Sequence, residues 1–242
     1  MSATFNNLFP FIVFGILLLI AIVFLVRRYL GPITLGTDSR ATNPGSVRLS
    51  DDKLKLFHPE LYSLTKWIPW VLANGWKYRD CPAFLRRSVW RSYFSQHLQL
   101  GDSQPAVCLT TTPQVVVAAY SIDIDCVAVL VFPDEFAQRY SLHSGKRLIS
   151  VNTYQSVDYG YGKDLSPGPE CSGLWGNFSP LIADFLTDDL EKLERRKREI
   201  PENRWTYLES LGYSYLTNRS QARSGAPMRA AEADVEWLLE HA

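Results

Sequence analysis

The chain has 242 residues, of which 46% are hydrophobic and 21% charged, and its 25 basic residues balance its 25 acidic ones. This apolar fraction excludes a disordered chain, and four cysteines are too few for a disulfide scaffold. Proteins that bind nucleic acid normally carry a basic excess, so the balanced charge gives no reason to expect a nucleic-acid partner. The length fits one domain with a short appendage.

A stretch near the N-terminus predicts a transmembrane helix. Residues 8–26 read LFPFIVFGILLLIAIVFLV and contain no charged side chain. Such a helix is about 28 Å long, close to the ~30 Å hydrocarbon thickness of a bilayer. A cleaved signal peptide is disfavoured, because the tail 1–7 has no basic residue and the stretch ends in Arg27 and Arg28. We expect a single-pass signal anchor over residues 8–28 that holds the protein at the lipid bilayer.

The positive charges near this stretch predict its orientation. Arg27 and Arg28 follow it, and no basic residue precedes it. The positive-inside rule then places the N-terminus outside and the C-terminal domain in the cytoplasm. Residues 29–52 are rich in glycine, proline and small polar residues without an apolar period, which predicts a flexible linker.

The segment from Lys53 to Leu100 is rich in tryptophan and in basic residues. It holds four of the seven tryptophans, and its eight basic residues outnumber two acidic ones. Helices are predicted at about 59–73 and 82–98. Aromatic stripes on helices usually pack on a core, and that interpretation stays open. The alternative is a surface that binds anionic headgroups or a neighbouring membrane protein. The candidate contact residues are Trp67, Trp70, Trp76, Arg86, Arg87 and Arg91.

Short apolar and β-branched runs follow, and they predict a sheet of about four strands. The predicted strands are residues 106–111, 114–120, 126–132 and 147–154. A short helix is expected at 133–140, and two longer ones at 179–199 and 202–216, where Pro180 suits the first turn of its helix. The predicted fold is an α+β domain over residues 53–216, with a mainly antiparallel sheet packed by helices from its N- and C-terminal sides. Residues 217–242 are expected to be mobile, with a short terminal helix.

Only weak candidates for catalysis are present. Asp123 and Asp125 alternate and share one face of an extended chain, so they are candidates for acid/base work. A polar hairpin tip in water is the plainer interpretation. Cys171 is a candidate nucleophile with His143 as its base. Cysteine and histidine spacing predicts no metal site, and no cofactor is expected.

The loop from 155 to 177 contains five glycines and two prolines. Loops of this length are often functional, although a loop that covers a sheet edge is the simpler interpretation. Its candidate ligand-binding residues are Tyr159, Tyr161, Lys163 and Trp175.

Together these features favour a protein that acts by binding over an enzyme. We expect a membrane-anchored accessory or scaffolding protein whose cytoplasmic domain binds a membrane-protein partner, a second copy of itself or the anionic membrane surface. The alternative is a membrane-tethered enzyme, or a sensor of a small ligand, that uses the loop 155–177. No family is recognised over the full length.

Overall fold

The computed structural model describes residues 41–59, 62, 83–156, 165–171, 175–218 and 222–226. The predicted anchor, residues 8–28, lies outside these ranges, as does most of the predicted mobile segment, residues 217–242. Among the described residues, no helix combines the length and the apolar character needed to cross a bilayer.

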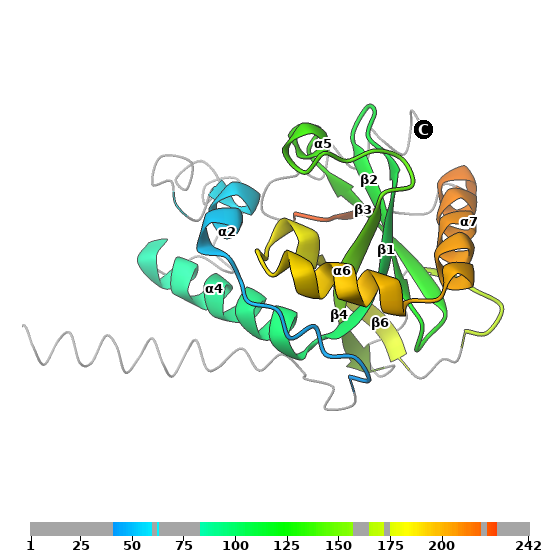
Figure 1. Ribbon diagram of the computed structural model, residues 1–242, viewed down its shortest axis with the longest axis horizontal. Helices are drawn as coiled ribbons and strands as arrows, with labels where there is room; N and C mark the ends of the chain where they lie inside the picture. Colours follow the sequence, from blue (N-terminus) through cyan, green and yellow to red (C-terminus); the bar gives the residue numbers. More distant parts are fainter. Residues whose placement is uncertain are drawn as a thin grey trace, which may run out of the picture.

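A curled sheet forms the centre of a mixed α+β fold (Figure 1). Six strands follow the order β5-β3-β2-β1-β4-β6, and every neighbouring pair is antiparallel. Their bounds are β1 Asp102–Thr110, β2 Val115–Ser121, β3 Cys126–Phe132, β4 Arg147–Ser156, β5 Leu165–Pro167 and β6 Trp175–Ile182. A seventh strand, β7 (Arg223–Ser224), pairs in parallel with β3.

The first four strands confirm the expectation from the apolar runs. Strands β2 and β3 are buried at every position, as expected for central strands covered on both faces. They form a hairpin that closes at the pair Ser121 and Cys126. Strand β1 begins at Asp102 rather than Ala106, because residues 102–105 pair with β4 before the pairing with β2 starts at Ala106.

The predicted number of strands was too small, and one predicted helix start was wrong. Residues 179–182 belong to strand β6, and only the later part of the predicted helix 179–199 is helical, as α6 (Leu190–Glu199). Pro180 lacks an N–H group, but β6 is the last strand of the sheet order, where a missing donor is tolerated. Strands β5 and β7 are too short to leave an apolar pattern in the sequence.

Helices cover the sheet on more than one side (Figure 1). Besides α6, their bounds are α2 Asp51–Phe57, α4 Ala83–Leu100, α5 Glu135–Arg139 and α7 Glu202–Asn218, with a 3₁₀ turn η3 at Ala183–Phe185. Helix α7 packs on β1, β2 and β3, whereas α4 and α6 pack on β4. Helices α4, α5 and α7 match the predicted ones, and the predicted helix 59–73 lies almost entirely outside the described residues.

The last part of the predicted linker, residues 41–52, is folded onto the domain. The Gly45 amide donates to the Gly101 carbonyl oxygen at 2.9 Å, and Pro44 forms a bridge with Asp102 in β1. Val47 is 2% exposed and belongs to the core. Helix α2 then begins at Asp51, after Ser50 caps it by accepting from the Lys53 amide. One buried valine and these backbone pairings hold a segment whose composition alone indicated a linker.

Candidate functional site

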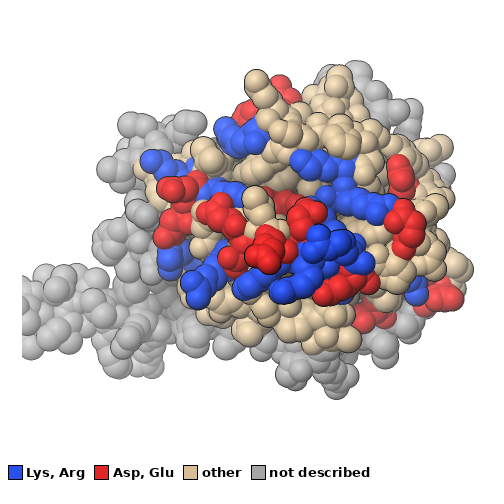
Figure 2. All heavy atoms as spheres, in the orientation of Figure 1, with Lys and Arg blue, Asp and Glu red and all other residues tan. Residues whose placement is uncertain are grey.

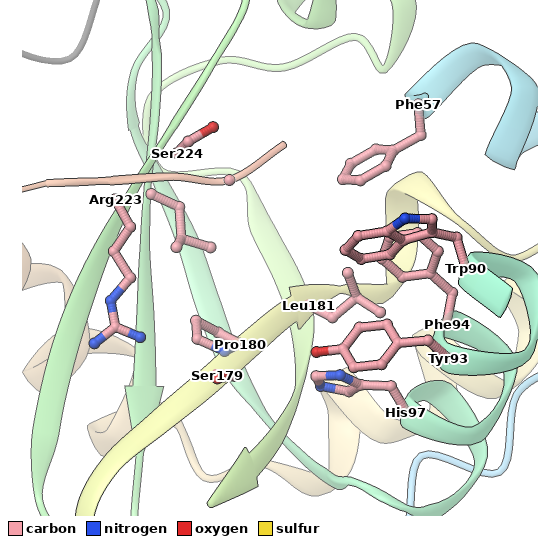
Figure 3. Close-up of a pocket in the computed structure, with 12 residues that line it drawn as sticks. Phe57, Trp90, Tyr93, Phe94, His97, Ser179, Pro180, Leu181, Arg223 and Ser224 are labelled. Atoms are coloured by element: carbon pink, nitrogen blue, oxygen red, sulfur yellow. The ribbon is translucent and has the colours of Figure 1, made fainter. Parts of the chain in front are cut away.

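A pocket of about 210 Å³ opens between helix α4 and strands β6 and β7 (Figure 3). Aromatic side chains from α2 and α4 form one wall, namely Phe57, Trp90, Tyr93, Phe94 and His97. The other wall comes from three strands and the residue after β7, namely Leu130, Ser179, Pro180, Leu181, Arg223, Ser224 and Gly225. The pocket therefore joins segments from almost the whole described chain.

The aromatic wall follows from helical spacing. Trp90, Tyr93, Phe94 and His97 stand at positions i, i+3, i+4 and i+7, which share one side of a helix. The Trp90 ring centroid lies 5.5 Å from that of Tyr93 and 5.6 Å from that of Phe94. Phe94 and His97 are buried, whereas Trp90 is half-buried. This packing fixes the wall, and Trp90 is a half-buried member of it.

His97 is uncharged at neutral pH. Its Nε2 lies 2.7 Å from the Val151 carbonyl oxygen, which only accepts, so Nε2 carries the proton and donates. Burial lowers the pKa of His97 to about 4, although this hydrogen bond opposes the shift. The aromatic wall therefore carries no charge in the physiological pH range.

Arg223 ties the opposite wall together. Its Nη2 donates to Asn177 Oδ1 at 2.7 Å, and its Nη1 donates to the Phe178 carbonyl oxygen. The guanidinium carbon also lies over the Phe178 ring, 5.7 Å from its centroid. Because Arg223 is in β7 and its partners are in β6, this side chain links the two strands.

Arg91 has an identified structural role. It makes a bidentate ion pair with Asp51 of α2, at 2.7 Å for Nε–Oδ1 and 3.2 Å for Nη2–Oδ2. The hydrogen bond from Arg91 to Asp51 raises the pKa of the guanidinium. The pair joins α2 to α4 next to Trp90. Of the other predicted contact residues, Trp67, Trp70 and Trp76 lie outside the described residues, as do the side chains of Arg86 and Arg87 in α4.

One predicted ligand-loop residue lies in the described part of the chain. Trp175 starts β6, and its ring centroid lies 5.5 Å from that of Tyr154. It packs on a small second core around Phe178 and Ile124 and does not line the pocket. Tyr159, Tyr161 and Lys163 lie outside the described residues.

The two candidate carboxylates do not share a face, because they lie in the turn between β2 and β3 rather than in an extended strand. Asp123 is exposed, and Asp125 is buried with a positive φ of 48°. Asp125 accepts hydrogen bonds from the Tyr207 hydroxyl at 3.1 Å, from the Glu170 amide at 2.8 Å and from the Tyr120 hydroxyl. The Asp125 carboxylate therefore fixes the turn to α7 and to the segment after β5.

Cys171 and His143, the weak candidates for a nucleophile and its base, have other neighbours in the described part of the chain. His143 is two residues before Gly145, whose amide donates to the carbonyl oxygen of Cys108 near the C-terminal end of β1. Cys171 lies at the opposite end of the sheet, where its Sγ is 3.5 Å from Sγ of Cys126 at the start of β3. Sequence spacing alone could not predict that two cysteines 45 residues apart meet here.

Charges of both signs alternate on the face shown in Figure 2. Helix α6 contributes much of this pattern through Lys192, Arg196 and Lys197, which pair with Asp189, Glu199 and Asp184. This face offers no broad region of one sign to a strongly charged partner. Within the described ranges, no group of three or more His, Cys, Asp or Glu side chains is placed to hold a metal ion.

Sequence reasoning missed the pocket as a unit. The spacing of Trp90, Tyr93 and His97 could have indicated one wall, but nothing local marks Leu181 or Arg223 as the other. Comparison with protein-family models, with curated proteins and with solved structures gives no match for this chain.

Proposed function

We propose that the chain is a membrane-anchored interaction protein whose α+β domain binds a membrane-protein partner through the pocket beside α4. The observation that carries this proposal is the half-buried Trp90 on a wall of packed aromatic rings that lines a pocket of about 210 Å³. Pockets for drug-sized ligands usually measure about 300–1,000 Å³. A smaller volume suits a single bulky side chain of another protein.

The chemistry of the two walls favours an aromatic side chain as the occupant. Tyrosine and tryptophan dominate the energetics of protein interfaces when they enter packed, desolvated pockets. Edge-to-face and offset contacts with Trp90, Tyr93 and Phe94 would each add about 0.5–1.5 kcal/mol to the burial of apolar area. Leu181 and Pro180 give the opposite side of the pocket an apolar surface.

The proposed anchor favours membrane proteins as partners of the domain. If residues 8–28 span the bilayer with the N-terminus outside, only residues 29–40 separate the anchor from the folded part of the chain. A stretch of that length reaches at most about 45 Å. The cytoplasmic domain would then stay close to the inner leaflet, where membrane proteins are its nearest neighbours.

The experiment is quantitative recovery of partners from solubilised membranes with the tagged full chain. Trp90→Ala is expected to reduce the recovered partner about tenfold or more, because truncating a central interface aromatic costs about 2 kcal/mol or more. The matched control is Leu190→Ala, which truncates an apolar side chain of α6 that is 56% exposed. Equal recovery with both variants would remove the pocket as the binding site.

A carbonate wash of the same membranes tests the anchor separately. Retention of the chain in the membrane fraction supports residues 8–28 as a span, and release into the wash contradicts it.

The alternative function, an enzyme or a sensor that uses the loop 155–177, stays a prediction. Three of its four candidate loop residues lie outside the described ranges, and Trp175 packs on Tyr154. Reaction of the Cys171 thiol at neutral pH no faster than that of a model thiol would contradict the nucleophile version.

A further inference from the structure

We propose that Cys126 and Cys171 are a redox-active thiol pair that a peroxide converts into an intramolecular disulfide. Their sulfur atoms lie 3.5 Å apart, and both are free thiols in this structure. Cys126 is buried, whereas Cys171 is exposed. The third described cysteine, Cys108, is buried in β1, where its thiol donates to the Thr110 carbonyl oxygen at 3.5 Å. This proposal is independent of the proposed binding function.

Backbone interactions bring the two thiols together without a bond between them. Strand β5 pairs with β3 so that Pro167 stands opposite Cys126. The Gly168 amide then donates to the Asp125 carbonyl oxygen at 2.6 Å, and the Cys171 amide donates to the Gly168 carbonyl oxygen at 3.3 Å. The segment therefore folds back over the start of β3 and places Cys171 above Cys126.

Two further contacts hold the segment in this position. The Glu170 amide donates to the Asp125 carboxylate at 2.8 Å, one residue before Cys171. A Cβ atom on Gly168 would lie 2.2 Å from Asp125 Oδ2 and 2.4 Å from the Tyr207 hydroxyl oxygen, so only glycine allows this close approach. A disulfide needs the sulfurs about 2.0 Å apart. Closure therefore requires a local movement of Cys171, which lies at the exposed end of the segment.

The burial of the two thiols assigns their roles. Burial, followed by the hydrogen bond with Cys171, raises the pKa of Cys126 to about 12, so this thiol stays protonated at neutral pH. The exposed Cys171 is the thiol that a peroxide can reach, and the thiolate form is the nucleophile. Cys171 reacts first, and Cys126 resolves the product.

Hydrogen peroxide is the oxidant that converts the two thiols into a disulfide. The Cys171 thiolate attacks one peroxide oxygen, the S–O bond forms, the O–O bond breaks, and the departing hydroxide takes up a proton to give water and a sulfenic acid. The Cys126 sulfur then attacks Cys171 Sγ, its proton goes to the departing hydroxyl group, and a second water leaves. Two thiols lose two electrons, and one peroxide becomes two waters. A dithiol reverses the reaction by exchange.

The experiment uses the purified full chain in mild detergent, treated with hydrogen peroxide and then with a maleimide that blocks the remaining thiols. We expect loss of two of the four thiols, full recovery with dithiothreitol, and one disulfide-linked peptide pair that contains Cys126 and Cys171. Because this measurement is made on the unmodified chain, it does not depend on any variant folding. A disulfide from Cys171 to Cys81 or Cys108, or retention of all four thiols, would overturn the proposal.

Variants separate the two roles. In Cys126→Ala the sulfenic acid on Cys171 should persist and react with dimedone, whereas in Cys171→Ser no thiol should be lost to an intramolecular disulfide. Cys108→Ser is the matched control, because it removes a buried thiol outside the pair and should leave the Cys126–Cys171 disulfide unchanged. Dimedone labelling of Cys171 that is equal in the unmodified chain and in Cys126→Ala would contradict the resolving role of Cys126.

Discussion

The two ends of the inner face of the sheet are built from different chemistry. At one end, Phe132 packs on Phe57, Phe136 and Phe185 with ring centroids 5.1–6.3 Å apart. At the other end, near the β2–β3 turn, strands β1, β2 and β4 carry buried polar residues on the same face. They are Asp102, Gln104, Ser121, Ser150 and Asn152.

The apolar end stabilises the fold, whereas the polar end contains buried groups that destabilise it. Burial of aromatic rings is the main favourable term at the apolar end. The polar end has groups without a hydrogen bond among the described residues, the side-chain carbonyl oxygens of Gln104 and Asn152. Such groups cost free energy when they are buried. We therefore expect large losses from truncation at the first end and smaller, pH-dependent effects at the second.

The largest effect should come from Phe132→Ala. This side chain is 1% exposed and contacts three other phenylalanine rings, so its removal leaves a cavity. We expect the free energy of unfolding to fall by about 3–5 kcal/mol, as measured by urea denaturation. Leu190→Ala on the surface should change it by less than about 0.5 kcal/mol. A loss below about 1 kcal/mol at Phe132 would contradict the apolar end as the main source of stability.

A smaller loss is expected for Asp125→Ala at the turn. The change leaves the buried Tyr120 hydroxyl and the Glu170 amide without their acceptor, at a cost of about 2–3 kcal/mol. Asp125→Asn keeps an acceptor oxygen and tolerates the positive φ, so it should lose less. Equal unfolding free energies for the two variants would show that the carboxylate does not fix the turn.

Asp102→Asn should stabilise the protein at neutral pH. Burial raises the pKa of Asp102 from 3.8 to about 6, and the nearby Asp123 adds to this shift, so the folded protein disfavours the charged form of Asp102. Asparagine resembles the uncharged form, and the unpaired Gln104 oxygen can turn to accept from its amide. We expect a gain of about 1–2 kcal/mol in the free energy of unfolding at pH 7.

The stability difference between Asp102→Asn and the parent chain should depend on pH. A carboxyl with a raised pKa in the folded state contributes stability below pH 3.8 and loses it as the pH rises through about 6. The difference between Asp102→Asn and the parent chain should therefore grow between pH 4 and 6 and stay constant above. His97, whose pKa is lowered to about 4, acts in the opposite direction in both proteins and cancels in the difference. A pH-independent difference would contradict the assignment.

The smallest effect should come from Arg91→Ala. Its ion pair with Asp51 is half-exposed, with side-chain exposures of 51% and 50%. Such pairs contribute about 0–1 kcal/mol, and less at high salt. Thermal unfolding of Arg91→Ala and the parent chain at low and high salt measures this contribution of the ion pair. A loss above about 2 kcal/mol would mean that the pair organises α2 and α4 more strongly than its exposure implies.

Much of the fold could be predicted because its signals are local. The unbroken apolar runs of β2 and β3 predicted central strands, and Pro82 followed by an apolar stripe predicted α4. Strand β6 could not be predicted, since Ser179-Pro180 is typical of a helix start and only its place at the end of the sheet order makes the proline tolerable. The packed residues 41–52 were missed because their order depends on contacts with residues far away in sequence, such as Asp102.

The candidate site was less predictable for the same reason. Trp90 and His97 belong to a local pattern, but Leu181 and Arg223 reach the pocket only through strand pairing. Cys126 and Cys171 meet because β5 pairs with β3, and the loop composition gave no sign of that short strand. Side chains whose role depends on tertiary contacts carry no local signal.

Photo-crosslinking from the pocket wall tests the central claim most directly. Trp90 in the full chain is replaced by p-benzoylphenylalanine, which keeps an aromatic ring in the pocket, and Tyr213 on α7, which is 40% exposed, receives the same replacement as the control. Irradiation in native membranes should link position 90, but not position 213, to one membrane protein, with the attachment at or next to an aromatic residue. Crosslinks to lipid alone, or the same products from both positions, would contradict the proposal that this pocket binds a partner's side chain.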